Sequence, residues 1–148
     1  MTTTAPTTNG RVIALAHYSA RALLEGVLTR HGITFEQSVT LRVVTVAGGA
    51  VERDALVTDV IGSLKSDPVV VRGVIDELTT AKLLEQDPER ASLLRLTDAG
   101  RELYGTATAE TAEISARLYA GIPAEDLAVA GRVLTLLTER ANAELAGA

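Results

Sequence analysis

Cysteine is absent from this chain, and histidine is nearly so. The lack of cysteine excludes disulfides, thiolate zinc sites and cysteine nucleophiles. The two histidines, His17 and His31, are 14 residues apart, which disfavours an imidazole metal site within one chain. We therefore expect neither a metal nor a cofactor.

Long apolar runs are also missing. No stretch reaches the roughly 18–20 apolar residues that a membrane span needs. The first ten residues, MTTTAPTTNG, lack the basic segment and apolar core of a signal peptide. We expect a cytoplasmic protein with no membrane partner.

Signatures of common enzymes are missing as well. The chain has no phosphate-binding P-loop and no G-x-G-x-x-G, and Gly48-Gly49 is too short to cradle a phosphate. No serine stands in a G-x-S-x-G setting. The sequence predicts that the protein is not an enzyme.

Positive charge is scarce. The net charge is −5 and the isoelectric point is about 5.0. A general nucleic-acid binder is usually basic, so this balance excludes a uniformly basic surface. It leaves room for a local basic patch on an acidic body.

What the chain does contain is helical periodicity over the length of one domain. Residues 1–9 lack an apolar stripe and are predicted to be a disordered tail. From Arg11 to Arg30, apolar residues recur every three or four positions, which predicts a helix that ends at Gly32. Residues 10–148 are predicted to form a single domain.

Start signals place three further helices. The TFEQ sequence at 34–37 is a capping-box pattern, so a short helix should run to about Val46. Apolar spacing indicates a third helix at 53–64. Asp67 followed by Pro68 is a strong N-terminal signal for a fourth helix, to about Ala81.

The period then changes. Residues 83–86 and 93–96 are short strand-like runs on either side of turn-forming residues 87–92, which predicts a β-hairpin. Thr97 should cap a long helix over 98–119. A last helix is expected from Ala124 to about Leu145.

This order, together with several local motifs, resembles the MarR family of winged helix-turn-helix regulators. GITFEQ at 32–37 is similar to the family's G-L-T-x-x-Q, and LRLTDAG at 94–100 to its L-x-L-T-x-x-G. LKSDPVVVRGVIDEL at 64–78 is similar to the stretch that spans the turn and the recognition helix, and IPAEDL at 122–127 to the start of the last helix.

The resemblance implies a mainly α fold with a small β-hairpin wing: four helices, the hairpin, then two long helices. The DNA-binding lobe would be 33–97. Helices 10–31 and 98–146 would pair two copies into a homodimer. The implied function is that of a sequence-specific transcription regulator, an effector-responsive repressor that binds double-stranded DNA at a pseudo-palindromic operator.

The recognition helix and the wing supply the predicted DNA contacts. Among the first turns of that helix only Arg72 is a good donor to bases or phosphates, while Val69 and Val70 offer methyl groups for thymine. Gly73 costs helix stability and permits close packing or close approach. The predicted DNA-binding residues are Arg42, Lys65, Ser66, Val69, Val70, Arg72, Gly73 and Arg90.

Each of these readings has an alternative. Arg72 would otherwise be a solvated helix charge, and Arg90 a hairpin-tip charge paired with Asp87 or Glu89. The segment from Arg42 to Thr97 contains seven basic and nine acidic residues, so DNA binding should be weak for this fold. The alternative function is a winged-helix dimer without DNA binding, acting as a ligand-sensing or protein-interaction module.

An effector site is the last prediction. The family often binds small aromatic or anionic molecules between the dimer helices and the DNA-binding lobe. We expect His17, Tyr18, Arg21 and Phe35 to line such a pocket. The alternative is that these side chains serve packing or remain simply exposed.

Overall fold

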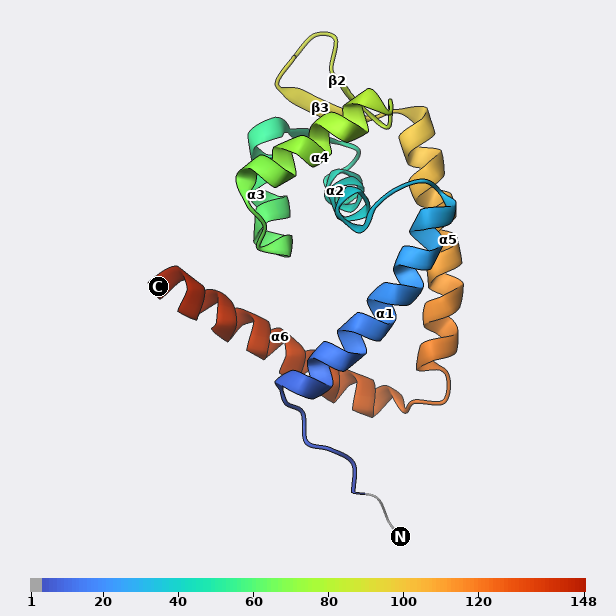
Figure 1. Ribbon diagram of the computed structural model, residues 1–148, viewed down its shortest axis with the longest axis vertical. Coiled ribbons are helices and arrows are strands. Elements are labelled where there is room, and N and C mark those ends of the chain that lie inside the picture. The colour runs from blue at the N-terminus through green and yellow to red at the C-terminus, as the bar shows by residue number, and fades with distance from the viewer. Residues whose placement is uncertain (1–3) are drawn as a thin grey trace. The chain divides into compact units, whose positions relative to one another are not determined.

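The computed structural model describes residues 4–148 and divides them into two compact units that meet between Glu113 and Ile114. The described elements are six helices and three strands (Figure 1). They are α1 (Gly10–Arg30), α2 (Phe35–Val46), β1 (Ala50–Glu52), α3 (Arg53–Leu64), α4 (Pro68–Thr80), β2 (Leu84–Gln86), β3 (Leu93–Leu96), α5 (Asp98–Tyr119) and α6 (Ala124–Gly147). The predicted fold class is confirmed.

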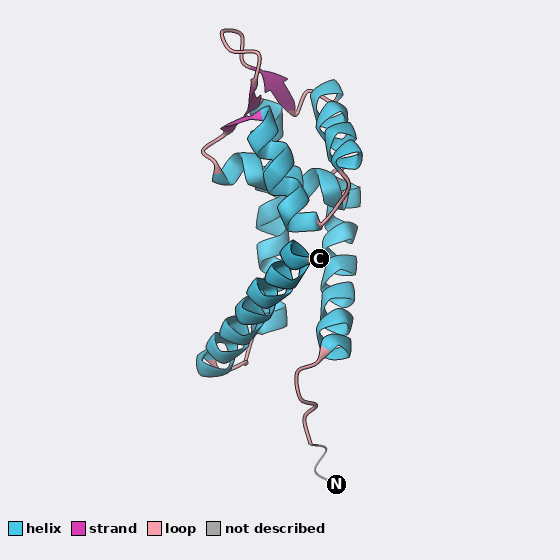
Figure 2. Ribbon diagram, turned by 90° about the vertical axis from the view of Figure 1, so that its left-hand side faces the viewer, coloured by secondary structure: helices cyan, strands magenta, loops and turns pink. Residues whose placement is uncertain are grey.

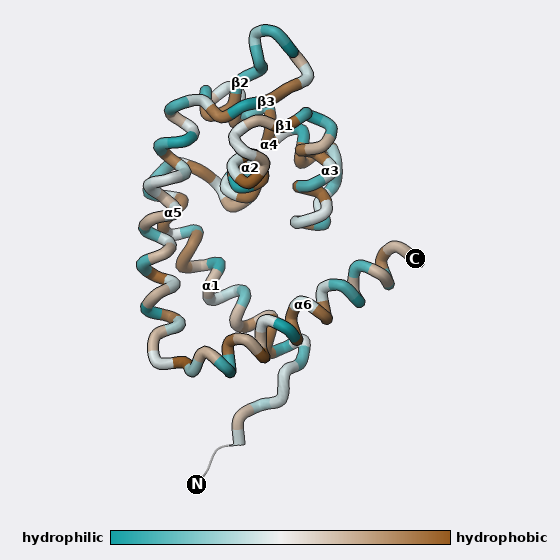
Figure 3. Tube along the Cα trace, turned by 180° about the vertical axis from the view of Figure 1, so that it is seen from behind, coloured by the Kyte–Doolittle hydropathy of each residue, from teal (hydrophilic) through white to brown (hydrophobic). Residues whose placement is uncertain are grey.

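The core of the first unit forms where α2, α3 and α4 meet the sheet. Its largest fully buried side chains are aliphatic, and they come from five different elements: Leu41, Leu56, Ile75, Leu78, Leu84 and Leu94. α2 lies between α3, α4 and α5 in Figure 1, and the brown apolar segments of the tube converge there in Figure 3. Burial of this kind, at roughly 25 cal/mol per Å² of apolar surface, is what holds these short helices together.

The predicted helix caps form as expected. The Thr34 hydroxyl accepts from the Gln37 amide at 3.1 Å, and the Gln37 side chain accepts from the Thr34 amide at 3.0 Å. The Asp67 carboxylate accepts from the Val69 amide at 2.7 Å, with Pro68 in the first turn. Asn9 caps α1 by accepting from Val12, although it was assigned to the tail.

The remainder of the predicted tail is described only in part. Residues 4–9 are exposed and carry no helix or strand, and residues 1–3 lie outside the described residues. Whether this segment is disordered stays a prediction.

The sheet has one strand more than the sequence predicted. β3 pairs antiparallel with β2, as expected for the hairpin, and also with β1, so the strand order is β1-β3-β2. Gly48 and Gly49, both with φ of 97°, turn the chain from α2 into β1. A strand of only three residues shows no readable period, and its partner lies more than forty residues further along the chain.

A tight contact joins β2 to the start of α5. The Thr97 hydroxyl donates to the Lys82 carbonyl at 2.6 Å and accepts from the Gly100 amide at 2.9 Å. Gly100 is buried, and a methyl group placed on it would overlap the carbonyl group of Leu83. Because the obstacle is backbone, no side-chain rotation relieves it. The glycine in LRLTDAG is therefore required by packing.

This contact predicts opposite effects for two glycine substitutions on α5. Gly100→Ala should destabilise the protein by about 2 kcal/mol or more through overpacking. Gly105→Ala, where a Cβ meets open space, should stabilise the helix by about 0.5–1 kcal/mol. Urea denaturation of the two variants and the parent measures both. If both substitutions changed the free energy of unfolding equally, the overlap with the Leu83 carbonyl group could not be the reason for glycine at position 100.

Candidate functional site

The outward face of α4 is set by what the helix buries. Val71, Val74, Ile75 and Leu78 are buried in the core, at helical spacing. Residues before and between them face solvent: Val69 is 73% exposed and Val70 51%, and Arg72 and Gly73 are also exposed. A short amphipathic helix thus presents its N-terminal turns outward, with two large apolar side chains among them.

The chain before α4 adds one cation. Lys65 adopts a left-handed backbone conformation with φ of 56° and ends α3, and its ammonium donates to the Gly62 carbonyl at 2.6 Å. Ser66 is half-buried in the turn that follows. Both predicted residues therefore lie directly before the first turn of α4.

The loop between β2 and β3, residues 87–92, is named the wing loop here. Figure 2 shows it extending beyond the sheet, and Figure 3 colours most of it as hydrophilic. The Asp87 carboxylate accepts from the amides of Glu89 and Arg90, which fixes the turn.

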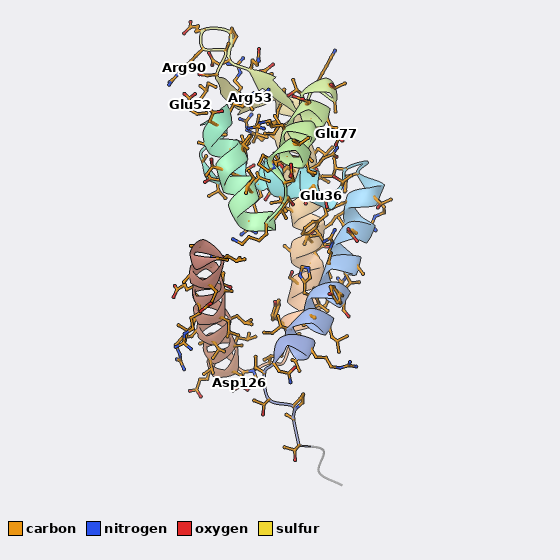
Figure 4. All side chains as sticks on the ribbon, turned by 60° about the vertical axis from the view of Figure 1, so that its left-hand side comes forward. Glu36, Glu52, Arg53, Glu77, Arg90 and Asp126 are labelled. Carbon is orange, nitrogen blue, oxygen red and sulfur yellow. The ribbon has the colours of Figure 1, made fainter. Side chains whose placement is uncertain are left out.

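Arg90 is not paired with the carboxylates that the sequence suggested. Its guanidinium lies 2.5 Å from the carboxylate of Glu52, the last residue of β1. Figure 4 shows the two side chains together at the base of the wing loop. Sequence reasoning missed Glu52 because it missed β1, which carries this carboxylate to the hairpin.

Other cations of this region also have acidic partners. Arg53 lies 3.7 Å from Asp76, whose side chain is 71% exposed, and Arg95 contacts Glu85 at 2.9 Å. Arg72 makes no ion pair within residues 4–148. Carboxylates therefore occupy several arginines around α4 and leave Arg72 available.

A cavity of about 340 Å³ opens in the same unit, between α1, α2 and α5. Its lining is mostly apolar, with a few hydroxyl groups and one guanidinium. The lining residues are Leu24, Leu28, Phe35, Ser38, Val39, Arg42, Tyr104, Ala107, Thr108 and Thr111. A pocket of this size with few polar groups suits a small organic molecule.

The four predicted effector residues divide into two pairs. Phe35 lines the cavity, and Arg21 stacks over its ring with the guanidinium carbon 4.1 Å from the centroid. Arg21 also pairs with Glu25 and Glu36. His17 and Tyr18 are exposed, with ring centroids 5.9 Å apart, and neither belongs to the cavity lining.

Of the predicted DNA contacts, Arg42 lines the cavity. It stands on the cavity wall beside Phe35 and Ser38, opposite residues of α5. The structure therefore groups Arg42 with the cavity, while Lys65, Ser66, Val69, Val70, Arg72 and Gly73 are grouped at α4.

Comparison with solved structures identifies the architecture. The MarR-family regulator from Rhodococcus sp. RHA1 is 21% identical, with a TM-score of 0.71, over 87% of this chain and 91% of that chain. CouR from Rhodococcus jostii RHA1, solved with p-coumaroyl-CoA, is 20% identical, with a TM-score of 0.73, over 87% and 90%. BpsR from Bordetella bronchiseptica, whose DNA binding is regulated by 6-hydroxynicotinic acid, is 23% identical, with a TM-score of 0.69, over 90% and 98%. The fold is the MarR-type winged helix.

In sequence, by contrast, no protein-family model and no curated protein matches the chain. Among the described residues, no helix is long and apolar enough to cross a membrane. The same residues contain no group of three or more histidines and carboxylates able to hold a metal ion.

In this winged helix an ionic cluster ties the end of α1 to α5 beside the cavity. The Glu110 carboxylate accepts from Arg30 at 2.9 Å and contacts the His31 ring at 3.0 Å. The hydrogen bond with Arg30, and to a smaller extent the one with His31, lowers the pKa of Glu110. A lowered carboxyl pKa stabilises the folded state above the unfolded pKa, and that stabilisation is lost as the pH falls through the folded pKa.

Several cavity residues of the winged helix escaped sequence reasoning. Tyr104, Ala107, Thr108 and Thr111 lie at positions i, i+3, i+4 and i+7 and therefore share one face of α5. That spacing was readable in the sequence, but it predicts only a buried face. Nothing local says that this face meets Phe35 and Arg42 across a gap.

Proposed function

We propose that this protein is a DNA-binding transcription regulator that acts as a homodimer and responds to a small effector, most simply as a repressor. The observation that carries the proposal is the outward N-terminal face of α4, which holds Arg72 free of ion pairs among the described residues, on a MarR-type winged helix. A helix presented in this way fits the major groove, where its first turns reach base edges.

In this proposal α4 enters the major groove and Arg90 of the wing loop reaches the adjacent minor groove. Lys65 and Ser66, just before α4, contact phosphates, and Arg72 contacts a base or a phosphate. Arg42 is reassigned from the DNA to the effector cavity because it lines that cavity.

The ion pair between Arg90 and Glu52 opposes this binding mode. Arg90 can reach a phosphate only by leaving a carboxylate that lies 2.5 Å away. Exposed pairs of this kind contribute about 0.2–1 kcal/mol, so the pair weakens DNA binding without preventing it. Glu52 thus lowers the affinity of the protein for DNA.

Homodimer formation follows from apolar surface that one chain leaves uncovered. No residue of α6 is buried, although the helix is 24 residues long. Its exposed large apolar side chains are Val129, Leu134, Leu136, Leu137 and Leu145. Leu134, Leu137 and Leu145 share one face of the helix by helical spacing, and uncovered apolar surface of this kind marks an interaction site. A second copy of α6 is the partner that a two-fold operator requires.

The cavity between α1, α2 and α5 is the proposed effector site. Its aromatic ring at Phe35, its guanidinium at Arg42 and its apolar lining suit an aromatic carboxylate. CouR, which has this fold, was solved with p-coumaroyl-CoA, and 6-hydroxynicotinic acid regulates DNA binding by BpsR, which has the same fold. We propose a ligand of related chemistry here, an aromatic ring that carries an anionic group.

A second candidate function rests on the same ion pairs. Carboxylates hold Arg53, Arg90 and Arg95, which leaves few cations for phosphate contacts. This favours the alternative of a winged-helix dimer that senses a ligand or binds a protein without binding DNA. The first experiment below separates the two functions.

Selection from a random-sequence duplex library, followed by fluorescence anisotropy at several salt concentrations, tests DNA binding. We expect a specific duplex to be enriched and Arg72→Ala to weaken its binding by about tenfold or more. Arg90→Ala should reduce the salt slope by about one. Arg11→Ala, in the first turn of α1 and outside the predicted DNA contacts, serves as the control. Enrichment of no duplex at low salt would favour the second candidate function.

Glu52→Gln should strengthen DNA binding up to about fivefold, because it releases Arg90. Glu89→Gln removes the same charge from the wing loop without touching the pair and is the matched control. The excess gain of Glu52→Gln over this control should vanish in an Arg90→Ala background. A gain that persists there would show that Glu52 acts only through net charge.

Sedimentation equilibrium should give twice the chain mass of 15.5 kDa. Leu134→Glu should shift the protein toward monomer because it places a charge in the proposed interface. Ala128→Glu, which lies by helical spacing on the face of α6 that carries none of these apolar side chains, should not. A wild-type monomer at micromolar concentration would remove the homodimer proposal.

Salicylate, used as a probe aromatic carboxylate, should raise the melting temperature by several degrees when it is present well above its dissociation constant. Arg42→Ala should abolish most of this shift, whereas Arg11→Ala should leave it intact. No shift with salicylate or with 6-hydroxynicotinic acid would argue against an aromatic acid as the ligand.

A further inference from the structure

The exposed first turns of α4 are poor in hydrogen-bonding groups. Of the side chains that they present, Val69 and Val70 are apolar, Gly73 has no side chain, and only Arg72 can donate. Val69 and Val70 are among the exposed large apolar residues of the chain, at 73% and 51%. The core takes Val71 and Val74 instead, so the two exposed valines contribute less to the burial that stabilises α4.

Gly73 is unexplained by packing. A Cβ placed on it would meet no atom within 4 Å, so the fold tolerates a side chain at this position. Glycine inside a helix costs about 1 kcal/mol relative to alanine. Packing within the chain does not explain why α4 contains this destabilising glycine. The glycine does leave the helix backbone uncovered beside the two exposed valines.

The charges around this surface indicate what covers it. Lys65 precedes the helix and Arg72 lies within the surface, whereas the Asp67 carboxylate caps the N-terminal end of α4 by accepting from the Val69 amide. Asp76, one turn further along, faces Arg53 at 3.7 Å. A polyanion with apolar groups between its charges complements this arrangement, and the DNA major groove at thymine has that character.

We propose that α4 reads its operator mainly through thymine methyl groups. Val69 and Val70 contact the C5-methyl groups of neighbouring thymines, Gly73 lets the helix backbone approach the groove closely, and Arg72 supplies the single polar contact. The inference rests on the proposed DNA binding and specifies its substrate: a half-site with adjacent thymines where α4 lies.

Deoxyuridine tests this directly, because it removes the methyl group and keeps every hydrogen bond of thymine. The duplex enriched from the random library by the full-length protein is resynthesised with single deoxyuridine substitutions. We expect each contacted methyl group to account for about three- to fivefold in affinity. Deoxyuridine in the flanking sequence is the control and should have no effect.

Combining each valine variant with each deoxyuridine substitution shows which valine contacts which methyl group. Val69→Ala and Val70→Ala should each abolish the sensitivity to one deoxyuridine and leave the sensitivity to the other. Gly73→Ala should raise the melting temperature while it weakens DNA binding by about tenfold or more, because a side chain keeps the helix out of the groove. Gly105→Ala should raise the melting temperature equally and leave DNA binding unchanged.

The outcomes separate this inference from the proposed function. If no duplex is enriched, DNA binding itself fails, and the inference fails with it. If a duplex is enriched whose binding depends on Arg72 but tolerates deoxyuridine throughout, DNA binding stands and thymine readout is overturned. A Gly73→Ala variant that binds as tightly as the parent would likewise remove the close approach.

Discussion

Burial of one face of α4 is the constraint on which the rest depends. Val71, Val74, Ile75 and Leu78 enter the core and thereby fix the rotation of the helix about its own axis. Rotation by about 100°, the step of one residue, would bury Arg72 and expose core side chains, which the hydrophobic energy forbids. The outward position of Val69, Val70, Arg72 and Gly73 is thus a by-product of packing. The buried residues of α4 thus determine which of its residues are exposed to a binding partner, although they would not contact that partner themselves.

The electrostatic character of the molecule follows from how its carboxylates are placed. A count of charges between Arg42 and Thr97 suggests only an acidic lobe. The structure shows that the acids are not spread evenly, since Glu52, Asp76 and Glu85 each lie beside an arginine. These pairs lower the local positive potential of the wing side and leave it intact at Arg72. In the proposed binding mode, Arg72 would supply specificity while few free cations attract phosphate nonspecifically.

The sequence was sufficient for features that depend on neighbouring residues, and insufficient for features that depend on distant ones. The capping box at Thr34, the start of α4 at Asp67 and the hairpin around residues 87–92 are local chemistry, and each formed as predicted. β1 was missed because its identity as a strand comes entirely from β3. The charge of Arg42 is visible in the sequence, whereas the cavity that it lines is not, because residues of three helices form it; its DNA contact stays a prediction.

The contact between Gly100 and Leu83 has a mechanical consequence. It joins backbone to backbone, and the Thr97 hydroxyl reinforces it, so there are no rotamers at this point with which to absorb a displacement. The turns of α5 that follow form one wall of the cavity. A displacement of that wall along α5 would therefore reach the backbone at Leu83, between the end of α4 and the start of β2.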